Sequence, residues 1–227
     1  MKTIRLADLP CPETLDGPYP MAWFVRREDM VALGNSKGDS IPLVLRYSAV
    51  PFTHIDDLRG LIGIARSVGA KRVFEIGTFN GATAVQLHRA GFHVESLDLP
   101  PGQEGTFYDL NDEWIALPNS KNGFYAKNPP HPITLHYCDS MYFYPGALAA
   151  TFDLVFVDGY HSADYVASDS RLAMKLLRPG GTIVWDDFHL DERVAAPAKA
   201  FVEGRGGELV SVPEIDMAFW TEPCRAT

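Results

Sequence analysis

The sequence has no excess of basic residues and no block of lysines or arginines. Its 227 residues include 20 Lys and Arg against 29 Asp and Glu, which gives a formal net charge of −9. A protein that binds nucleic acid needs a basic surface to neutralise phosphates. We therefore expect no nucleic-acid partner.

Cysteine and long apolar runs are also scarce. The three cysteines (Cys11, Cys138 and Cys224) are odd in number and lack metal-ligand spacing, so neither a disulfide framework nor a zinc site is expected. No apolar run is long enough to cross a bilayer, and the N-terminal stretch lacks the apolar segment of a signal peptide. These absences predict a cytoplasmic protein without a membrane partner.

The composition that remains is typical of a globular protein, with 46% hydrophobic and 22% charged residues. Residues 1–52 are rich in prolines and polar turns, and we interpret them as an N-terminal arm or cap. A regular pattern begins at residue 53, so one domain is expected over 53–227.

Within this domain, short apolar runs alternate with helical patterns. Strands are expected at 71–76, 93–99, 133–139, 152–158 and 182–187, followed by two runs, 208–215 and 217–223, that can pair as a hairpin. Helices are expected at 53–68, 82–90, 162–177 and 192–202, and the stretch "RPGG" at 178–181 is expected to end the third. The alternation predicts an α/β protein with a doubly wound, mostly parallel sheet and a C-terminal antiparallel hairpin.

An acid stands at the end of five successive expected strands. These acids are Glu75, Asp98, Asp139, Asp158 and Asp186. Ligands on doubly wound sheets bind beyond the carboxyl ends of the strands. Aspartate is also common there because it makes turns and caps helices, but five acids at one edge favour a binding site.

The stretch "VFEIGTFNGAT" at 73–83 places a glycine turn between a strand and a helix, where a ligand can approach the backbone. Its spacing, Glu75-x-Gly77-x-x-x-Gly81, is not the G-x-G-x-x-G of dinucleotide enzymes. An acid before the turn disfavours a phosphate and favours a cation or an amino group. A ligand with adenosine at one end and a charged amino acid at the other fits both features.

This turn, the spaced acids, "VFVDGYHSADYV" at 155–166 and "LLRPGGTIVWDD" at 176–187 resemble the class I S-adenosylmethionine-dependent methyltransferases. The resemblance is to small-molecule O-methyltransferases and to bacterial relatives that share "DG-x-HS", and it covers about residues 53–223. It implies a seven-stranded Rossmann-like methyltransferase sheet.

The resemblance also implies a set of residues that bind S-adenosylmethionine. Asp98 would accept both ribose hydroxyls, and Asp139 the adenine amino group, although Asp139 as a helix cap is the alternative. Thr83 would hold the carboxylate of the methionine part. The full set is Glu75, Gly77, Thr78, Phe79, Gly81, Thr83, Asp98, Asp139, Ser140 and Asp158.

A divalent cation is a second implication of the resemblance. Asp158, Asp186 and Asp187 match the positions that hold a metal in related O-methyltransferases. Oxygen ligands suit Mg²⁺, with Mn²⁺ or Ca²⁺ as substitutes. The alternative is that Asp186 and Asp187 end the strand and cap the next helix.

His161 lies three residues after Asp158, where some of these families carry a catalytic lysine. We interpret His161 as the general base, with Asp158 beside it at the catalytic centre, because the pKa of histidine is near operating pH. The alternatives are that His161 caps the next helix or orients Asp158, and His189 is a second candidate base.

Residues 100–130 form a long connection that is expected to be a substrate-side insertion. The sequence thus predicts methyl transfer to a small-molecule hydroxyl with a divalent metal. A metal-independent O- or N-methyltransferase with His161 as base, or a non-catalytic S-adenosylmethionine-binding protein, remains open. So does a homodimer formed through the hairpin or the arm.

Overall fold

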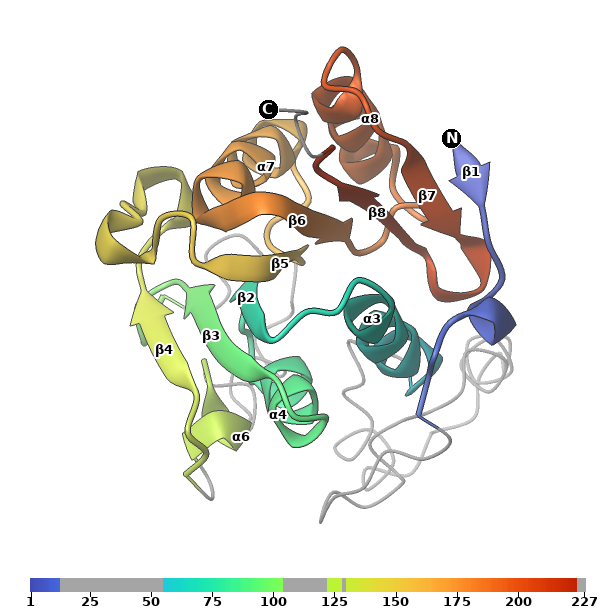
Figure 1. Ribbon diagram of the computed structural model, residues 1–227. Helices are drawn as coiled ribbons and strands as arrows, with labels where there is room; N and C mark the ends of the chain where they lie inside the picture. The colour runs from blue at the N-terminus through green and yellow to red at the C-terminus, as the bar shows by residue number, and fades with distance from the viewer. Residues whose placement is uncertain (13–54, 104–121, 128–129, 224–227) are drawn as a thin grey trace, which may run out of the picture.

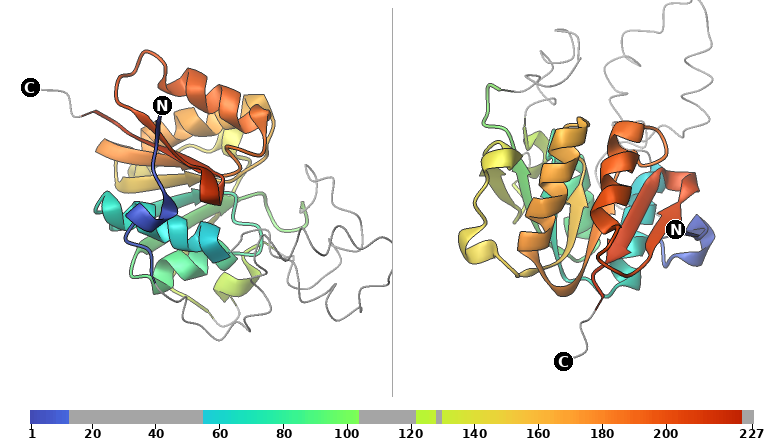
Figure 2. Two further views of the ribbon diagram at one scale, coloured as in Figure 1. Left: turned by 90° about the vertical axis from the view of Figure 1, so that its right-hand side faces the viewer. Right: turned by 90° about the horizontal axis from the view of Figure 1, so that it is seen from above.

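The computed structural model describes residues 1–12, 55–103, 122–127 and 130–223, and it has a sheet between two helical layers (Figures 1 and 2). The strands are β1 (Lys2–Thr3), β2 (Arg72–Ile76), β3 (His93–Asp98), β4 (Thr134–Tyr137), β5 (Phe152–Val157), β6 (Leu177–Trp185), β7 (Leu209–Val212) and β8 (Met217–Thr221). The α-helices are α3 (Ile55–Ser67), α4 (Ala82–Arg89), α6 (Phe124–Lys127), α7 (Ala163–Leu176) and α8 (Glu192–Val202). Short 3-10 turns include η4 (Ser140–Tyr142) and η6 (Pro213–Ile215).

The sheet has the order β1-β7-β8-β6-β5-β2-β3-β4. Strands β2 to β6 are mutually parallel, and β8 pairs antiparallel with both β6 and β7, which confirms the C-terminal hairpin. The prediction of seven strands was wrong, because the sheet has eight. The additional strand is β1, whose two residues pair with Val210 and Ser211 through the backbone alone and carry no apolar pattern that sequence reasoning could detect.

A second correction concerns "RPGG". Helix α7 ends at Leu176, just before these residues, as expected, but residues 177–181 already belong to β6, which was expected to begin at 182. The register of β6 against β5 shifts between Phe152 and Leu154. Gly180 has a φ of +79°, which makes the backbone of β6 locally irregular. From its proline and glycines, this part of the strand was expected to be a loop.

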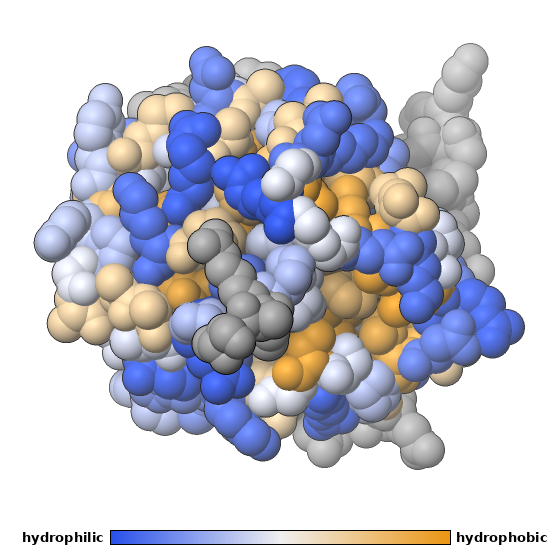
Figure 3. All heavy atoms as spheres, turned by 45° about the horizontal axis from the view of Figure 1, so that its top comes forward, coloured by the Kyte–Doolittle hydropathy of each residue, from blue (hydrophilic) through white to orange (hydrophobic). Residues whose placement is uncertain are grey.

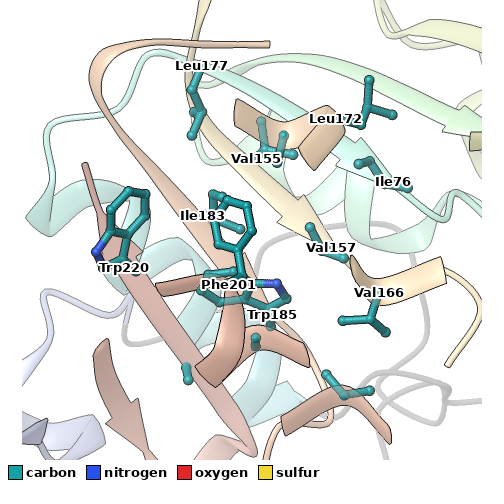
Figure 4. Packing of buried hydrophobic residues seen from close by; sticks show 14 of the residues in the cluster. Ile76, Val155, Val157, Val166, Leu172, Leu177, Ile183, Trp185, Phe201 and Trp220 are labelled. Carbon is teal, nitrogen blue, oxygen red and sulfur yellow. The ribbon is translucent and has the colours of Figure 1, made fainter. Parts of the chain in front are cut away.

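Two hydrophobic layers hold the sheet between its helices. On the face under α7 and α8, Trp185, Phe201 and Trp220 pack against each other edge-on, and Figure 4 shows them with the apolar side chains of β5 and α7. The buried indole N–H of Trp185 donates to Ser170 Oγ at 3.0 Å. The other face packs α3 and α4 against the sheet through a second cluster that includes Leu61 and Leu87.

Hydrophilic side chains cover much of the face seen in Figure 3, with hydrophobic residues in patches between them. In the part of the chain that the structure describes, no helix combines the length and the apolarity that a membrane crossing needs. Most of the expected arm at 1–52 and the greater part of the expected insertion at 100–130 lie outside the described residues. Both therefore stay predictions.

Candidate active site

The ends of the parallel strands are aligned at one edge of the sheet. Backbone hydrogen bonds continue the ladder just past the strands, from Gly77 N to Leu97 O (2.8 Å), Cys138 N to Asp98 O (2.8 Å), Asp158 N to Ile76 O (2.9 Å) and Asp186 N to Val157 O (3.1 Å). The five strand-end acids therefore lie along the same edge, as the sequence predicted. Glu75 is the penultimate residue of its strand, since β2 continues to Ile76.

The glycine turn fits closely against the end of β5. Gly77 has φ +101°, and a Cβ atom there would lie 1.9 Å from the carbonyl oxygen of Asp158. The turn continues through Phe79, with φ +43°, whose N–H donates to Asp98 Oδ2 at 2.5 Å. Gly81, with φ +81°, then begins α4 beside α6. Gly77 is thus required by backbone packing between two strand ends, in addition to any ligand.

Beneath the turn, Glu75 is fully buried, and burial raises the pKa of its carboxyl well above the usual range. Ser96 Oγ donates to Glu75 Oε2 and lies 2.5 Å from Thr78 Oγ1, while Glu75 Oε1 is buried without a hydrogen-bond partner. Thr78 and Thr83 are themselves buried, at 4% and 7% exposure. The structure therefore places these two predicted cofactor residues below the surface of the turn.

A pocket opens at the edge between the ends of β2, β3, β4 and β5, and we call it the edge pocket. Of the predicted cofactor residues, it brings together Gly77, Asp98, Asp139 and Ser140. Its lining is completed by Ile76, Leu97, Leu99, Cys138, Gly159, Tyr160 and Tyr165. Asp98 also accepts from the N–H of Leu99 at 2.7 Å, so backbone donors from both β3 and the glycine turn fix its carboxylate.

Asp139 has the capping role that the sequence left as the alternative, and it also lies in the wall of the edge pocket. As the N-cap of η4 it accepts from Met141 N at 2.9 Å. Its second oxygen, Oδ2, accepts from the hydroxyl of Tyr165 at 3.0 Å. Burial, together with the hydrogen bond to Asp139, raises the pKa of Tyr165 to about 12. Tyr165 was not among the residues that the sequence predicted for the site.

Asp169, one turn further along α7, was also missed. It is 1% exposed, its Oδ1 has no hydrogen-bond partner, and burial raises the pKa of its carboxyl to about 7, an effect that the neighbouring Ser140 partly offsets. A Cβ atom on Gly159 would come within 3.0 Å of Asp169 Oδ2, so the helix packs tightly under the pocket. The sequence did contain one signal for this residue, because Asp169 is an acid on the mostly apolar face of α7.

His161 lies between two carboxylates. Its Nδ1 is 3.5 Å from Asp187 Oδ2, and its Nε2 is 3.9 Å from Asp158 Oδ1. The nearby carboxylate of Asp158 raises the pKa of the imidazole, and the negative charge of Asp187 adds to the effect. Ser162 caps α7 by accepting from Tyr165 N at 3.3 Å, which removes capping from the roles considered for His161. His189 is exposed.

The three acids considered as metal ligands influence each other through their charges. Burial raises the pKa of Asp158 to about 6 and that of Asp186 well above its usual range, and Asp187 raises both further. Nevertheless, among the described residues no three His, Cys, Asp or Glu side chains are grouped so that they could hold a metal ion.

A family model described as a methyltransferase domain matches residues 74–188, from the second strand to the residue after Asp187. No curated protein matches the sequence significantly. Several solved structures share the fold. A candidate caffeoyl-CoA O-methyltransferase from Staphylococcus aureus is 15% identical, with a TM-score of 0.59 over 86% of this chain and 98% of its own.

Two further structures are similar at 18% identity. The S-adenosylhomocysteine-bound methyltransferase PaMTH1 of Podospora anserina has a TM-score of 0.55 over 93% of this chain and 98% of its own. The O-methyltransferase TomG of Streptomyces achromogenes, solved with S-adenosylmethionine and involved in tomaymycin synthesis, has a TM-score of 0.51 over 88% and 95%. These likenesses confirm the predicted fold class.

Proposed function

The chain belongs to the methyltransferase family whose domain model matches residues 74–188, and on this premise we propose that it methylates a hydroxyl group of a small molecule. It is an S-adenosylmethionine-dependent enzyme. The observation that carries the choice of a hydroxyl acceptor is the position of His161 between Asp158 and Asp187. A hydroxyl must lose its proton to become a good nucleophile, and a partly buried imidazole flanked by carboxylates can take it.

The edge pocket has the donor and acceptor groups that S-adenosylmethionine requires. Asp98 ends a strand of the parallel sheet, where a carboxylate can accept the two ribose hydroxyls. Asp139 and Ser140 line the same pocket and suit the adenine ring, and Gly77 and Gly159 leave backbone accessible. When bound, the cofactor supplies a methyl group on a positively charged sulfur.

The two carboxylates give His161 an orientation and a charge partner. With Nδ1–H directed at Asp187, Nε2 is the nitrogen left to accept a proton from the acceptor hydroxyl. Asp158, 3.9 Å from Nε2, then stabilises the positively charged imidazolium that proton transfer produces. The removal of the proton and the alignment of the oxygen are the contributions of these side chains.

The test is His161→Ala, assayed by formation of S-adenosylhomocysteine with a panel of phenols, catechols and sugars. We expect kcat to fall by about 10²- to 10⁴-fold, the usual contribution of a general base, while S-adenosylhomocysteine binds with unchanged affinity. His189→Ala, at an exposed position, is the matched control. Wild-type turnover in the His161 variant would reject the proposal, and binding without turnover on any acceptor would favour a protein that only binds the cofactor.

A divalent cation is a second candidate, favoured by the negative charge of Asp187, which helps to raise the pKa of both Asp158 and Asp186. Asp158, Asp186 and Asp187 are not grouped as metal ligands in this structure, so they would have to come closer together to hold the ion. The measurement is a calorimetric titration of Mg²⁺ and then Mn²⁺ into protein saturated with S-adenosylhomocysteine. Binding that disappears in Asp158→Ala would support the metal, and no binding to the wild type would exclude these two ions.

A further inference from the structure

Helix α7 contributes two polar side chains to the loop that follows β4. Tyr165 and Asp169 are four residues apart and therefore lie on one face of the helix. Tyr165 donates from its hydroxyl to Asp139, and Asp169 lies close enough to Ser140 for the serine to lower the pKa of its carboxyl. Asp139 and Ser140 are the two pocket residues that suit the adenine ring. The helix thus supports the nucleobase end of the edge pocket from below.

Without Tyr165, the carboxylate of Asp139 would be held through one of its two oxygens. Its Oδ1 accepts from Met141 N within the same short turn, and this contact leaves the carboxylate free to rotate about the bond to Cβ unless Oδ2 is also held. The Tyr165 hydroxyl supplies the second contact at 3.0 Å. Because the pKa of Tyr165 is about 12, the hydroxyl keeps its proton and donates it at any physiological pH.

Tyr165 is also part of the wall of the edge pocket. Its ring meets that of Tyr160 edge-to-face, with centroids 5.4 Å apart, and both rings line the pocket. The ring and the hydroxyl therefore have separable roles, since the ring packs at the wall and the hydroxyl holds the acid.

We propose that Tyr165 is a positioning residue for cofactor specificity, which fixes the Asp139 carboxylate so that it selects the amino group of adenine. A carboxylate only accepts hydrogen bonds, so it pairs with an exocyclic amino group and repels the carbonyl oxygen that hypoxanthine carries at the same position. A carboxylate that can rotate loses part of this selectivity. The inference rests on S-adenosylmethionine binding and is independent of the methyl acceptor.

The experiment compares two ligands by calorimetry: S-adenosylhomocysteine and its analogue with hypoxanthine in place of adenine. Tyr165→Phe keeps the ring and removes the hydroxyl. We expect affinity for S-adenosylhomocysteine to fall about tenfold, the size of one hydrogen bond to a charged group, and affinity for the hypoxanthine analogue to change less than about twofold. Tyr144→Phe, which removes a hydroxyl from an 86% exposed tyrosine near the same loop, is the matched control and should change neither.

Asp139→Asn provides an independent variant, because an amide can donate to the hypoxanthine oxygen. It should also reduce the preference for adenine, and adding Tyr165→Phe to it should have little further effect if the two residues act together. An equal loss of both ligands in Tyr165→Phe, or no loss of either, would overturn the inference alone. Failure of the wild type to bind S-adenosylhomocysteine would overturn it together with the cofactor assignment.

Discussion

At the scale of single residues, the molecule is unusual in the number of acids that it removes from water near one edge. Glu75, Asp169 and Asp186 are exposed by 0%, 1% and 6%. Burial disfavours the charged form of a carboxyl group, and in all three it is the main cause of a raised pKa. Buried carboxyl groups with a raised pKa lower the stability of the folded protein. They are therefore found mostly at functional sites, where the shifted pKa is useful.

Asp169 allows this cost to be measured. Its pKa rises from 3.8 to about 7 on folding, so between these values the folded state holds a proton that the unfolded state has released. Stability must therefore decrease as pH rises through this window. We expect Asp169→Asn to match the wild type near pH 4 and to exceed it near pH 8, by at most about 4 kcal/mol for a shift of three pH units.

Urea denaturation at several pH values is the measurement for Asp169→Asn. Asp164→Asn, the same replacement at an exposed position of α7, controls for the loss of one negative charge. A difference between variant and wild type that stays constant from pH 4 to pH 8 would show that the Asp169 carboxyl titrates alike in both states.

The sequence predicted the strand-end acids but not their helix partners, for a physical reason. The position of an acid after a parallel strand determines which edge of the sheet it occupies, so Glu75, Asp98 and Asp158 could be grouped without coordinates. Tyr165 reaches the edge pocket, and Asp169 lies beside Gly159 of its wall, only because α7 packs at a particular rotation and depth. No spacing along the chain specifies that rotation, although a buried acid on an apolar helix face does indicate a polar contact.

At the scale of elements, the turn between β2 and α4 depends on contact with β5. Gly77→Ala would place a methyl group against the carbonyl of Asp158, at a backbone φ that alanine disfavours. Because the obstacle is backbone, the two strand ends must separate. We expect unfolding free energy to fall by on the order of 3 kcal/mol or more, with loss of S-adenosylhomocysteine binding.

Gly69→Ala is the matched control for Gly77→Ala. Gly69 also has a positive φ, of +67°, but a Cβ atom there would meet nothing within 4 Å. Its replacement should cost about 1 kcal/mol, the conformational term alone. Similar losses in both variants, measured by urea denaturation, would mean that the approach of Gly77 to Asp158 is not a constraint on the fold.

Element boundaries were predictable where side-chain chemistry sets them. Ser162 and Asp191 cap α7 and α8 through their own side-chain oxygens, and both helices begin where the sequence indicated. The start of β6 was not predictable in this way. Leu177 pairs with Phe152 of β5 and Thr182 pairs with Leu154, so the strand continues across a register shift at residues 178–181 despite Pro179 and Gly180.

At the scale of the whole molecule, the eighth strand protects an edge of the sheet. β1 covers the outer side of β7, and Ile4 N continues the pairing to Ser211 O at 3.0 Å (Figure 1). An uncovered strand offers unpaired backbone groups to another chain, and a lysine on the edge strand, such as Lys2, discourages such pairing. Two residues of β1 are thus enough to cover the outer edge of β7.

Deletion of residues 1–4 should expose the edge of β7. We expect a loss of about 1–2 kcal/mol from the missing hydrogen bonds and concentration-dependent self-association, measured by sedimentation velocity. A variant with alanine at position 3 keeps both Lys2 and the backbone pairing, and it should remain like the wild type. A truncated protein with unchanged stability and mass distribution would show that β1 has no protective role.

The pairing of β1 with β7 also sets an order in time. The two strands are about two hundred residues apart in the sequence, so during synthesis the first residues leave the ribosome long before their partner exists. At a translation rate of about 5–20 residues per second, this interval lasts on the order of 10–40 s. The parallel strands β2 to β6 emerge in between, which means that the sheet can assemble outward from its centre and that the earliest part of the chain is the last to join it.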